Sequence, residues 1–367
     1  MLHVYRTYFP DTQGGLEETI RQICRSTKSR QICHRIFTLS PDPTPSVIHF
    51  PEVDVYRYPL TVEVASCGMS LSGISGFRKL VKWADIVHYH YPWPYADLLH
   101  LICSVSKPCI VSYQSDIVRQ KILLKFYLPL QVRFLKSVRK IVATSPNYLK
   151  SSPILPLYSD KITVIPNGLD ETGYPKPASV AHRAVAGEYG KDFFLFVGVL
   201  RYYKGLQYLL AASKDQGFRV IVAGKGPMEK ELKIRAKELG LQNLRFAGYV
   251  DDTVKSCLIQ LSRGIVFPSH ERSEAYGMTL LEGAMFGKPL ITAEIGTGTS
   301  YINRHNDTGL VVPPCDSEAL RQAMLQLAED KEFAELCGVR ARKRYEKFFT
   351  ASIMGKQYVK LYRQMVG

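Results

Sequence analysis

Two glutamates, Glu274 and Glu282, stand eight positions apart in the stretch SEAYGMTLLEGAMFGKP. The run GIVFP before this stretch is typical of a buried strand, so we expect a helix to begin near Gly277, beyond the carboxyl end of that strand. The first backbone N–H groups of such a helix, at Gly277, Met278 and Thr279, have no acceptor within the helix and, with the helix dipole, favour an anion. Gly277 also lacks a side chain that would obstruct a phosphate. The spacing therefore predicts an anion site at the tip of this helix.

The two carboxylates would flank that anion. Glu282 is five residues into the expected helix, which at 1.5 Å per residue is roughly 7 to 8 Å along its axis. A carboxylate accepts hydrogen bonds from vicinal hydroxyls, so the pair suits a diphosphate with a hydroxyl-rich group at each end, as in a nucleotide sugar. In the competing interpretation, Glu274 is an acidic residue near a helix N-terminus that stabilises the helix by about 0.3 to 1 kcal/mol. Glu282 is then a solvent-exposed position of that helix. The apolar neighbours of Glu282, such as Met285 and Phe286, favour the functional role.

Two further loops follow expected strands. In VGVLRYYKG, which contains Gly198, the basic residues Arg201 and Lys204 could neutralise a diphosphate. The glycines Gly224 and Gly226 of AGKGP follow the next strand, but no Ser or Thr follows the lysine in the frame of a phosphate-binding Walker loop, which disfavours an ATPase. The first strand is not followed by G-x-G-x-x-G, and no G-x-S-x-G occurs, which argues against a nicotinamide enzyme and a hydrolase of that type.

The histidines of DIVHYHYPWP are the candidate metal ligands. His88 and His90 lie two apart on an expected strand and share a face, but no third ligand follows at a useful spacing. The 8 cysteines include no C-x-x-C pair and no His/Cys spacing suited to zinc, so we expect free thiols and no metal. His90, at the end of its strand, is expected to contact substrate. Asp251 and Asp252 predict the N-cap of a helix.

The elements that must position these residues alternate between short apolar runs and amphipathic segments. That pattern predicts an α/β protein with parallel sheets, and 367 residues are too many for one ordinary core. We expect two doubly wound domains, residues 1–170 and 191–345, joined by a polar, Pro-containing linker at 171–190. Residues 346–367 are expected to form a helix that packs back on the first domain.

The formal net charge of +15 implies an anionic partner: nucleic acid, a membrane face or a phosphorylated ligand. The segment 117–150 is basic and interleaved with Leu, Phe and Tyr, and no acidic residue occurs from Ile117 to Ser159. Its basic residues are Arg119, Lys121, Lys125, Arg133, Lys136, Arg139, Lys140 and Lys150. A basic helix with an apolar face suits an anionic membrane surface, although its apolar stripe could instead face a sheet, and both can hold at once. No secretory signal and no membrane-spanning run are evident, so a cytoplasmic protein is expected.

The motifs together resemble glycosyltransferase family 4. The resemblance is carried by Gly14-Gly15, HYH, PNG at Asn167-Gly168, VGVLRYYKG, AGKGP and above all the E-x7-E pair followed by NDTGLVVPP. It covers nearly the whole chain and is strongest over 193–314. It implies a retaining enzyme of the GT-B fold, in which two Rossmann-like doubly wound domains face each other across a cleft. FVGVLRYYKG and IGTGTSYIN are similar to bacterial O-antigen and lipopolysaccharide enzymes, particularly mannosyl- and rhamnosyltransferases.

The resemblance also implies roles for single residues. Glu274 would contact hydroxyls of the donor sugar, Glu282 the ribose, the amides of 277–279 the distal phosphate and Lys204 the diphosphate, while Gly14, Gly15 and His90 would close the site from the first domain. The family usually carries Arg where this chain has Val199, so Arg201 is expected to supply that charge. Many members also carry an acid where this chain has Tyr301.

The expected reaction is transfer of a hexose with retained configuration, without a cofactor or metal. GDP-mannose is the favoured donor and a UDP-hexose the second choice, and the acceptor is expected to be a lipid-linked saccharide at the inner face of the cytoplasmic membrane. A GT-B epimerase or phosphorylase would share this fold. A nucleic-acid binder would explain the charge, but no aromatic-and-basic RNA motif is visible, so no nucleic-acid partner is expected.

Overall fold

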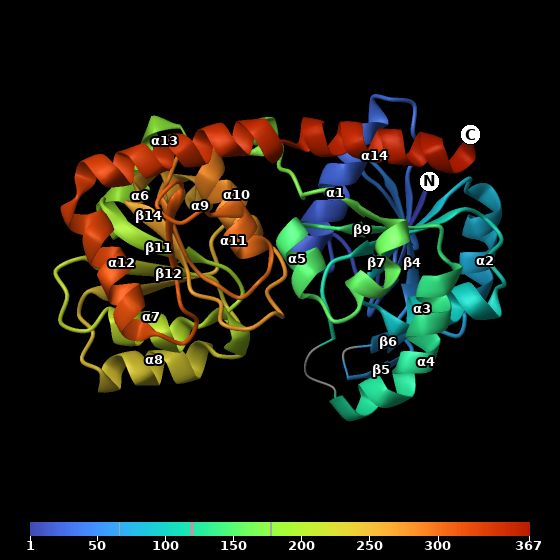
Figure 1. Ribbon diagram of the computed structural model, residues 1–367, viewed down its shortest axis with the longest axis horizontal. Helices are drawn as coiled ribbons and strands as arrows, with labels where there is room; N and C mark the ends of the chain where they lie inside the picture. The colour runs from blue at the N-terminus through green and yellow to red at the C-terminus, as the bar shows by residue number, and fades with distance from the viewer. Residues whose placement is uncertain (66, 118–120, 177) are drawn as a thin grey trace. The chain divides into compact units, whose positions relative to one another are not determined.

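The computed structural model describes residues 1–65, 67–117, 121–176 and 178–367. The chain forms two compact units, and the red C-terminal helix in Figure 1 belongs to the unit that contains the blue N-terminus. The N-terminal unit comprises Met1–Gly168 and Ala351–Gly367, and the C-terminal unit comprises Leu169–Thr350. Each unit is built on a largely parallel sheet with helices, which confirms the expected α/β class.

The N-terminal unit contains an eight-stranded sheet in the order β10-β9-β8-β7-β1-β2-β4-β3, parallel except for β3 at its edge. Its strands are β1 (Leu2–Val4), β2 (Arg35–Ser40), β3 (Val47–His49), β4 (Asp54–Pro59), β7 (Val87–Tyr91), β8 (Cys109–Tyr113), β9 (Lys140–Ala143) and β10 (Ile162–Val164), with a separate hairpin of β5 (Val62–Val64) and β6 (Cys67–Met69). Its helices are α1 (Gly15–Lys28), α2 (Gly73–Trp83), α3 (Pro94–Ile102), α4 (Lys121–Ser137), α5 (Pro146–Ser151), the 3-10 helix η1 (Leu155–Lys161) and α14 (Ala351–Val366). In this unit α14 packs against α1 and adds Met354, Tyr358 and Leu361 to a buried cluster with Ile23 (Figure 1).

The C-terminal unit contains a six-stranded parallel sheet in the order β13-β12-β11-β14-β15-β16. Its strands are β11 (Phe193–Val197), β12 (Arg219–Ala223), β13 (Leu244–Gly248), β14 (Gly264–Phe267), β15 (Leu290–Ala293) and β16 (Gly309–Val312). Its helices are η2 (Glu171–Gly173), α6 (Ser179–Tyr189), η3 (Tyr202–Lys204), α7 (Leu206–Ala212), α8 (Glu229–Glu238), α9 (Asp252–Leu261), α10 (Met278–Met285), α11 (Gly298–Ile302), α12 (Ser317–Glu329) and α13 (Lys331–Phe348). Strands β11, β12, β14 and β15 are almost wholly buried, as expected of parallel strands covered on both faces.

The strand order of the C-terminal sheet locates its ligand crevice. Consecutive strands run outward from β11 to β12 and β13, and then the chain returns to place β14 on the other side of β11. In open parallel sheets a ligand binds beyond the carboxyl ends of the two strands at such a switch point, because the loops that follow them part in opposite directions. The loops after β11 and β14 are those that carry Lys204 and Glu274.

The expected linker at 171–190 is wrong for most of its length. Ser179–Tyr189 forms helix α6, which packs on α9 within the C-terminal unit and buries Val185. The polar, Pro-containing composition suggested a linker, but a helix on the protein surface needs only a narrow apolar stripe. The boundary expected after residue 345 also differs, because α13 continues to Phe348 and the N-terminal unit resumes at Ala351.

Four histidines form a buried cluster in the N-terminal unit. His3 lies on β1, His88 and His90 lie on β7, and His34 directly precedes β2; all four side chains are buried. Parallel pairing sets His3 opposite His88, and the ring of His3 lies within 5.3 Å, between centroids, of each of the other three. The fold thus brings a third imidazole to the pair that the sequence left without one. His90 is the second-last residue of β7 and its side chain is buried, so its expected contact with substrate stays a prediction.

The cluster contains a directed chain of hydrogen bonds. Thr27 Oγ1 donates to the carbonyl of Ile23 at 2.7 Å and so accepts from His34 Nε2 at 2.8 Å. His34 Nδ1 must then accept from His3 Nε2, and His3 Nδ1 from His90 Nε2, each at 3.0 Å. Among the described residues His90 Nδ1 has no partner. This order of donors applies to neutral rings, the form that burial favours by lowering the pKa of each ring.

As the pH is lowered, the protein should therefore begin to lose stability before its carboxylates take up protons. Burial lowers the pKa of His34 and of His90 to about 3, and burial with the neighbouring rings lowers the pKa of His3 and His88 as well. Unfolded histidines titrate near pH 6.5, so this stability is complete above that pH and is lost as the pH falls toward 3. We expect the free energy of unfolding, measured in urea, to fall by roughly 1.4 kcal/mol per pH unit for each such histidine below pH 6. The slope should be smaller in His90→Asn; a free energy independent of pH between 7.5 and 5 would contradict this.

Candidate functional site

Helix α10 begins where the sequence predicts. Its first residue is Met278, and Gly277 is its N-cap with φ 91° and ψ 72°, a left-handed conformation that favours glycine. A Cβ on Gly277 would also meet Leu280 and the ring of Phe267 at 3.0 and 3.1 Å. Thr279 donates from its hydroxyl to the carbonyl of Val197 at 3.1 Å, which ties the first turn of α10 to the end of β11. The helix tip therefore lies at the switch point.

Glu274 and Lys204 form an ion pair at that tip. Their side chains are only 11% and 12% exposed, and Lys204 Nζ donates to Glu274 Oε2. The ammonium lies 4.5 Å from the centroid of Phe267 at the end of β14, and 3.8 Å from where a Cβ on Gly198 would stand after β11. The fold thus gathers Gly198, Lys204, Glu274 and the start of α10 around one point. A largely desolvated ammonium beside helix N–H groups is suited to binding a phosphate.

Glu282 is buried one turn inside α10, where it has two partners that the sequence did not indicate. Its Oε1 accepts from the hydroxyl of Tyr174 at 2.8 Å and from Lys255 Nζ at 2.8 Å. Lys255 also pairs with Asp252 Oδ1 at 2.9 Å. Burial alone would lower the pKa of Lys255, but the carboxylates of Glu282 and Asp252 raise it above its ordinary value. Sequence reasoning missed Lys255 because it read this segment as a helix cap; Asp251 does cap α9, accepting from the N–H of Val254.

The remaining glycines of the C-terminal unit are explained by backbone packing. Gly198 and Gly224 have φ of 155° and 135°, and a Cβ on Gly224 would stand 2.0 Å from the carbonyl oxygen of Gly198. A Cβ on Gly226 would stand 2.5 Å from the carbonyl oxygen of Leu200. The N–H groups of Gly198 and Gly224 already donate to backbone carbonyls. These glycines allow the loops after β11 and β12 to pack closely, and their expected place in the donor-binding site stays a prediction.

The other expected charges and glycines lie at exposed or terminal positions. Arg201 precedes η3 and has an exposed side chain, and Val199 is 42% exposed. Gly14 is the N-cap of α1 in the N-terminal unit, and Gly15 is the first residue of that helix. The two glycines therefore stand at a helix N-terminus, as Gly277 does in the C-terminal unit.

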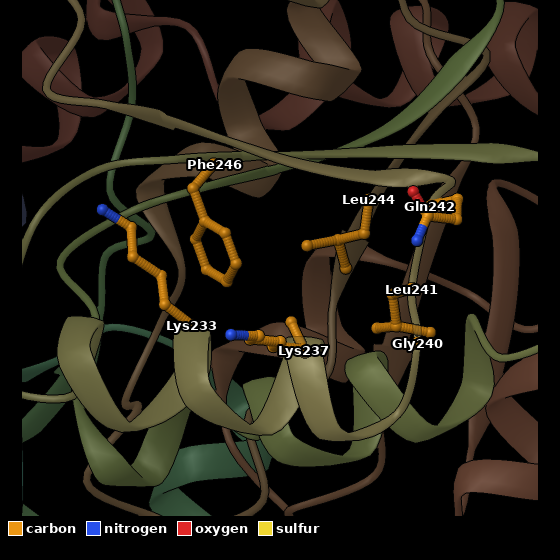
Figure 2. Close-up of a pocket in the computed structure, with 8 residues that line it drawn as sticks. Lys233, Lys237, Gly240, Leu241, Gln242, Leu244 and Phe246 are labelled. Atoms are coloured by element: carbon orange, nitrogen blue, oxygen red, sulfur yellow. The ribbon is translucent and has the colours of Figure 1, made fainter.

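A hollow of about 280 Å³ lies elsewhere on the C-terminal unit, between α8 and the edge strand β13. Figure 2 shows Lys233 and Lys237 on one side of it and Leu244 and Phe246 on the other. None of the expected site residues lines it. The candidate site is therefore located by strand order and helix geometry.

Family models match both units. A model described as "Glycosyltransferase Family 4" matches residues 13–172, and one described as "Glycosyl transferases group 1" matches residues 181–344.

Two curated relatives match along nearly their whole length. A D-rhamnosyltransferase of Pseudomonas aeruginosa, WbpZ, is 51% identical over 96% of this chain and 92% of its own. The O-antigen chain mannosyltransferase C of Escherichia coli is 45% identical over 100% of this chain and 98% of its own.

Solved structures share the fold at low sequence identity. Sucrose-phosphate synthase from Thermosynechococcus elongatus superposes with a TM-score of 0.82 at 19% identity, covering 99% of this chain and 98% of its own. Anabaena HepE in complex with UDP gives 0.81 at 16% identity, covering 99% of each chain. The lipopolysaccharide biosynthesis enzyme WaaG gives 0.70 at 15% identity, covering 97% and 98%. These similarities confirm the predicted GT-B class.

Proposed function

Because this chain belongs to the glycosyltransferases, with a family 4 domain followed by a group 1 domain, we propose that it transfers mannose from GDP-mannose to a lipid-linked saccharide in O-antigen synthesis, with retained configuration. The names of the two full-length relatives support the sugar class and the pathway. A UDP-hexose is the second candidate donor, because the similarly folded HepE has been solved with UDP-glucose.

The observation that carries this proposal is the ion pair of Glu274 and Lys204 at the tip of α10. Departure of the nucleoside diphosphate places negative charge on its distal phosphate. The ammonium of Lys204, the guanidinium of Arg201 and the first N–H groups of α10 would stabilise that charge. On donor binding Lys204 would exchange Glu274 for the phosphate, which leaves the carboxylate of Glu274 to orient the sugar hydroxyls. The departing phosphate can itself accept the proton of the attacking hydroxyl, so no separate base is required.

The test of function is a donor screen followed by product analysis. We expect GDP to raise the melting temperature of the protein more than UDP, CDP or ADP, because a ligand that binds the native state stabilises it by mass action. GDP-mannose with a lipid-linked acceptor should give an α-linked product by NMR, and turnover should persist in excess EDTA. A larger shift with UDP would favour the second donor, and loss of activity on chelation with recovery on adding Mn²⁺ would contradict the metal-free mechanism.

Helix α4 supports peripheral binding to an anionic membrane. Its second half is anchored by buried Gln131, Phe134 and Leu135, but in its first half Phe126 is 81% exposed and Leu123 is 50% exposed. The first half also faces inward in part, because the hydroxyl of Tyr127 donates to the buried carboxylate of Asp97, so its exposed apolar face comprises residues such as Leu123 and Phe126. Within the residues described, no helix is both long and apolar enough to span a bilayer. Apolar side chains among basic ones suit insertion at the headgroup level of anionic lipid.

We expect the protein to float with vesicles containing phosphatidylglycerol and not with pure phosphatidylcholine, and to be released by salt. Replacing Lys121, Lys125 and Arg133 with alanine should abolish flotation, and Phe126→Ser should weaken it. Of the expected basic set, Arg119 lies outside the described residues, as does the side chain of Lys121. Lys233→Ala with Lys237→Ala on α8 is the matched control and should float normally. Retention on an oligonucleotide column with no flotation would contradict membrane binding and favour nucleic acid.

A further inference from the structure

The carboxylate of Glu282 is held by one of its two oxygens. Tyr174 and Lys255 both donate to Oε1, so the two lone pairs of that oxygen are occupied. Glu282 Oε2 has no hydrogen-bond or ion-pair partner among the described residues. The carboxylate is thus fixed in orientation with one oxygen open to a further donor.

Lys255 is equally constrained. Its side chain is 18% exposed, and two of its three N–H groups reach Glu282 Oε1 and Asp252 Oδ1. Among the described residues, the third N–H group of Lys255 has no hydrogen-bond or ion-pair partner. Glu282 Oε2 can accept a further hydrogen bond, and the ammonium of Lys255, which binds the other oxygen of the same carboxylate, can donate one. Together the two groups match a vicinal diol, in which one hydroxyl can donate and the other can accept.

The three groups come from three separate elements. Glu282 lies on α10, Lys255 on α9, and Tyr174 directly follows η2. The ring of Tyr174 also lies 5.4 Å from Lys255 Nζ, within cation–π range. Such an arrangement fixes both charged side chains in single rotamers before any ligand arrives, which reduces the entropy lost on binding.

We propose that Lys255, with Tyr174, is a positioning residue that presents Glu282 to the ribose diol of the donor and makes the site selective for ribonucleotides over deoxyribonucleotides. This inference rests on the proposed function, because it takes the donor to be a nucleotide sugar. Without Lys255, Glu282 would be a buried carboxylate with no cation, which would either rotate away or take up a proton.

The experiment compares ribo- and deoxyribonucleoside diphosphates by calorimetry. The wild-type protein should bind GDP at least about tenfold more tightly than 2′-deoxy-GDP or 3′-deoxy-GDP, since a hydrogen bond to a charged group is lost. In Lys255→Met this preference should fall to about twofold or less, and Lys255→Arg should restore part of it. With GDP-mannose, Lys255→Met should raise KM by a larger factor than it lowers kcat, because ribose contacts bind ground and transition states alike.

Lys233→Met is the matched control, because Lys233 is an exposed lysine that pairs with Glu229 on α8 of the same unit. Its preference should equal that of the wild-type protein. Should Lys255→Met not fold, Tyr174→Phe decides, since it removes only one hydroxyl and should also reduce the preference. If the wild-type protein binds no nucleoside diphosphate, the proposed function fails. If it prefers GDP and both variants keep that preference in full, the role of Lys255 is overturned while the function stands.

Discussion

Glu274→Ala is expected to lower kcat by about 10²-fold or more, because the carboxylate orients the reacting sugar and misplacement by an ångström has costs of that order. The substitution also leaves Lys204 largely buried without its partner. Initial rates with GDP-mannose at saturating acceptor measure the effect. KM for the donor should change less than kcat, since the contact matters most when the glycosidic bond breaks.

The control for this variant is Glu271→Ala. Glu271 lies in the same loop, but its side chain is 34% exposed and its ion pair is with His270, at 3.7 Å. It should retain nearly full activity. Glu274→Gln keeps the shape and one acceptor oxygen, and we expect an intermediate rate. Full activity in Glu274→Ala, with an unchanged melting temperature, would refute the assignment of this residue.

Lys204→Met should have the second largest effect, a loss of about 10² to 10³ in kcat, comparable with removal of one preorganised donor to a developing negative charge. Its ammonium lies beside Gly198 and Phe267 at the switch point, where little water screens it. Affinity for a nucleoside diphosphate should fall more than affinity for the monophosphate, because the expected contact is with the distal phosphate. Calorimetry with GDP and GMP separates the two.

Arg201→Ala shows whether Lys204 or Arg201 contributes more to kcat. Arg201 is exposed, so water and salt screen its charge, and its removal should cost less than tenfold in kcat. If Arg201→Ala instead costs as much as Lys204→Met, then Arg201 fully replaces the family arginine absent at Val199. If Lys204→Met remains active, the phosphate is bound elsewhere and the ion pair with Glu274 is only structural.

The local pattern of the sequence predicted the parts of this fold that depend on neighbouring residues. The buried apolar runs of β11, β12 and β14 and the start of α10 at Gly277 were predictable, because strand burial and helix capping involve residues a few positions apart. The same reasoning misread 171–190, where α6 follows from packing against α9 and not from composition.

By itself the sequence determined that two carboxylates, a glycine and a basic loop stand at the carboxyl ends of parallel strands, since spacing and strand periodicity fix those positions. Only the tertiary structure decided what each group touches. Glu282 meets Tyr174 from a distant segment, His90 packs against His3 in a buried cluster, and Gly224 is required by the backbone of Gly198. The physical reason is that such contacts depend on how whole elements pack, and no periodicity along the chain records which side chains meet across them.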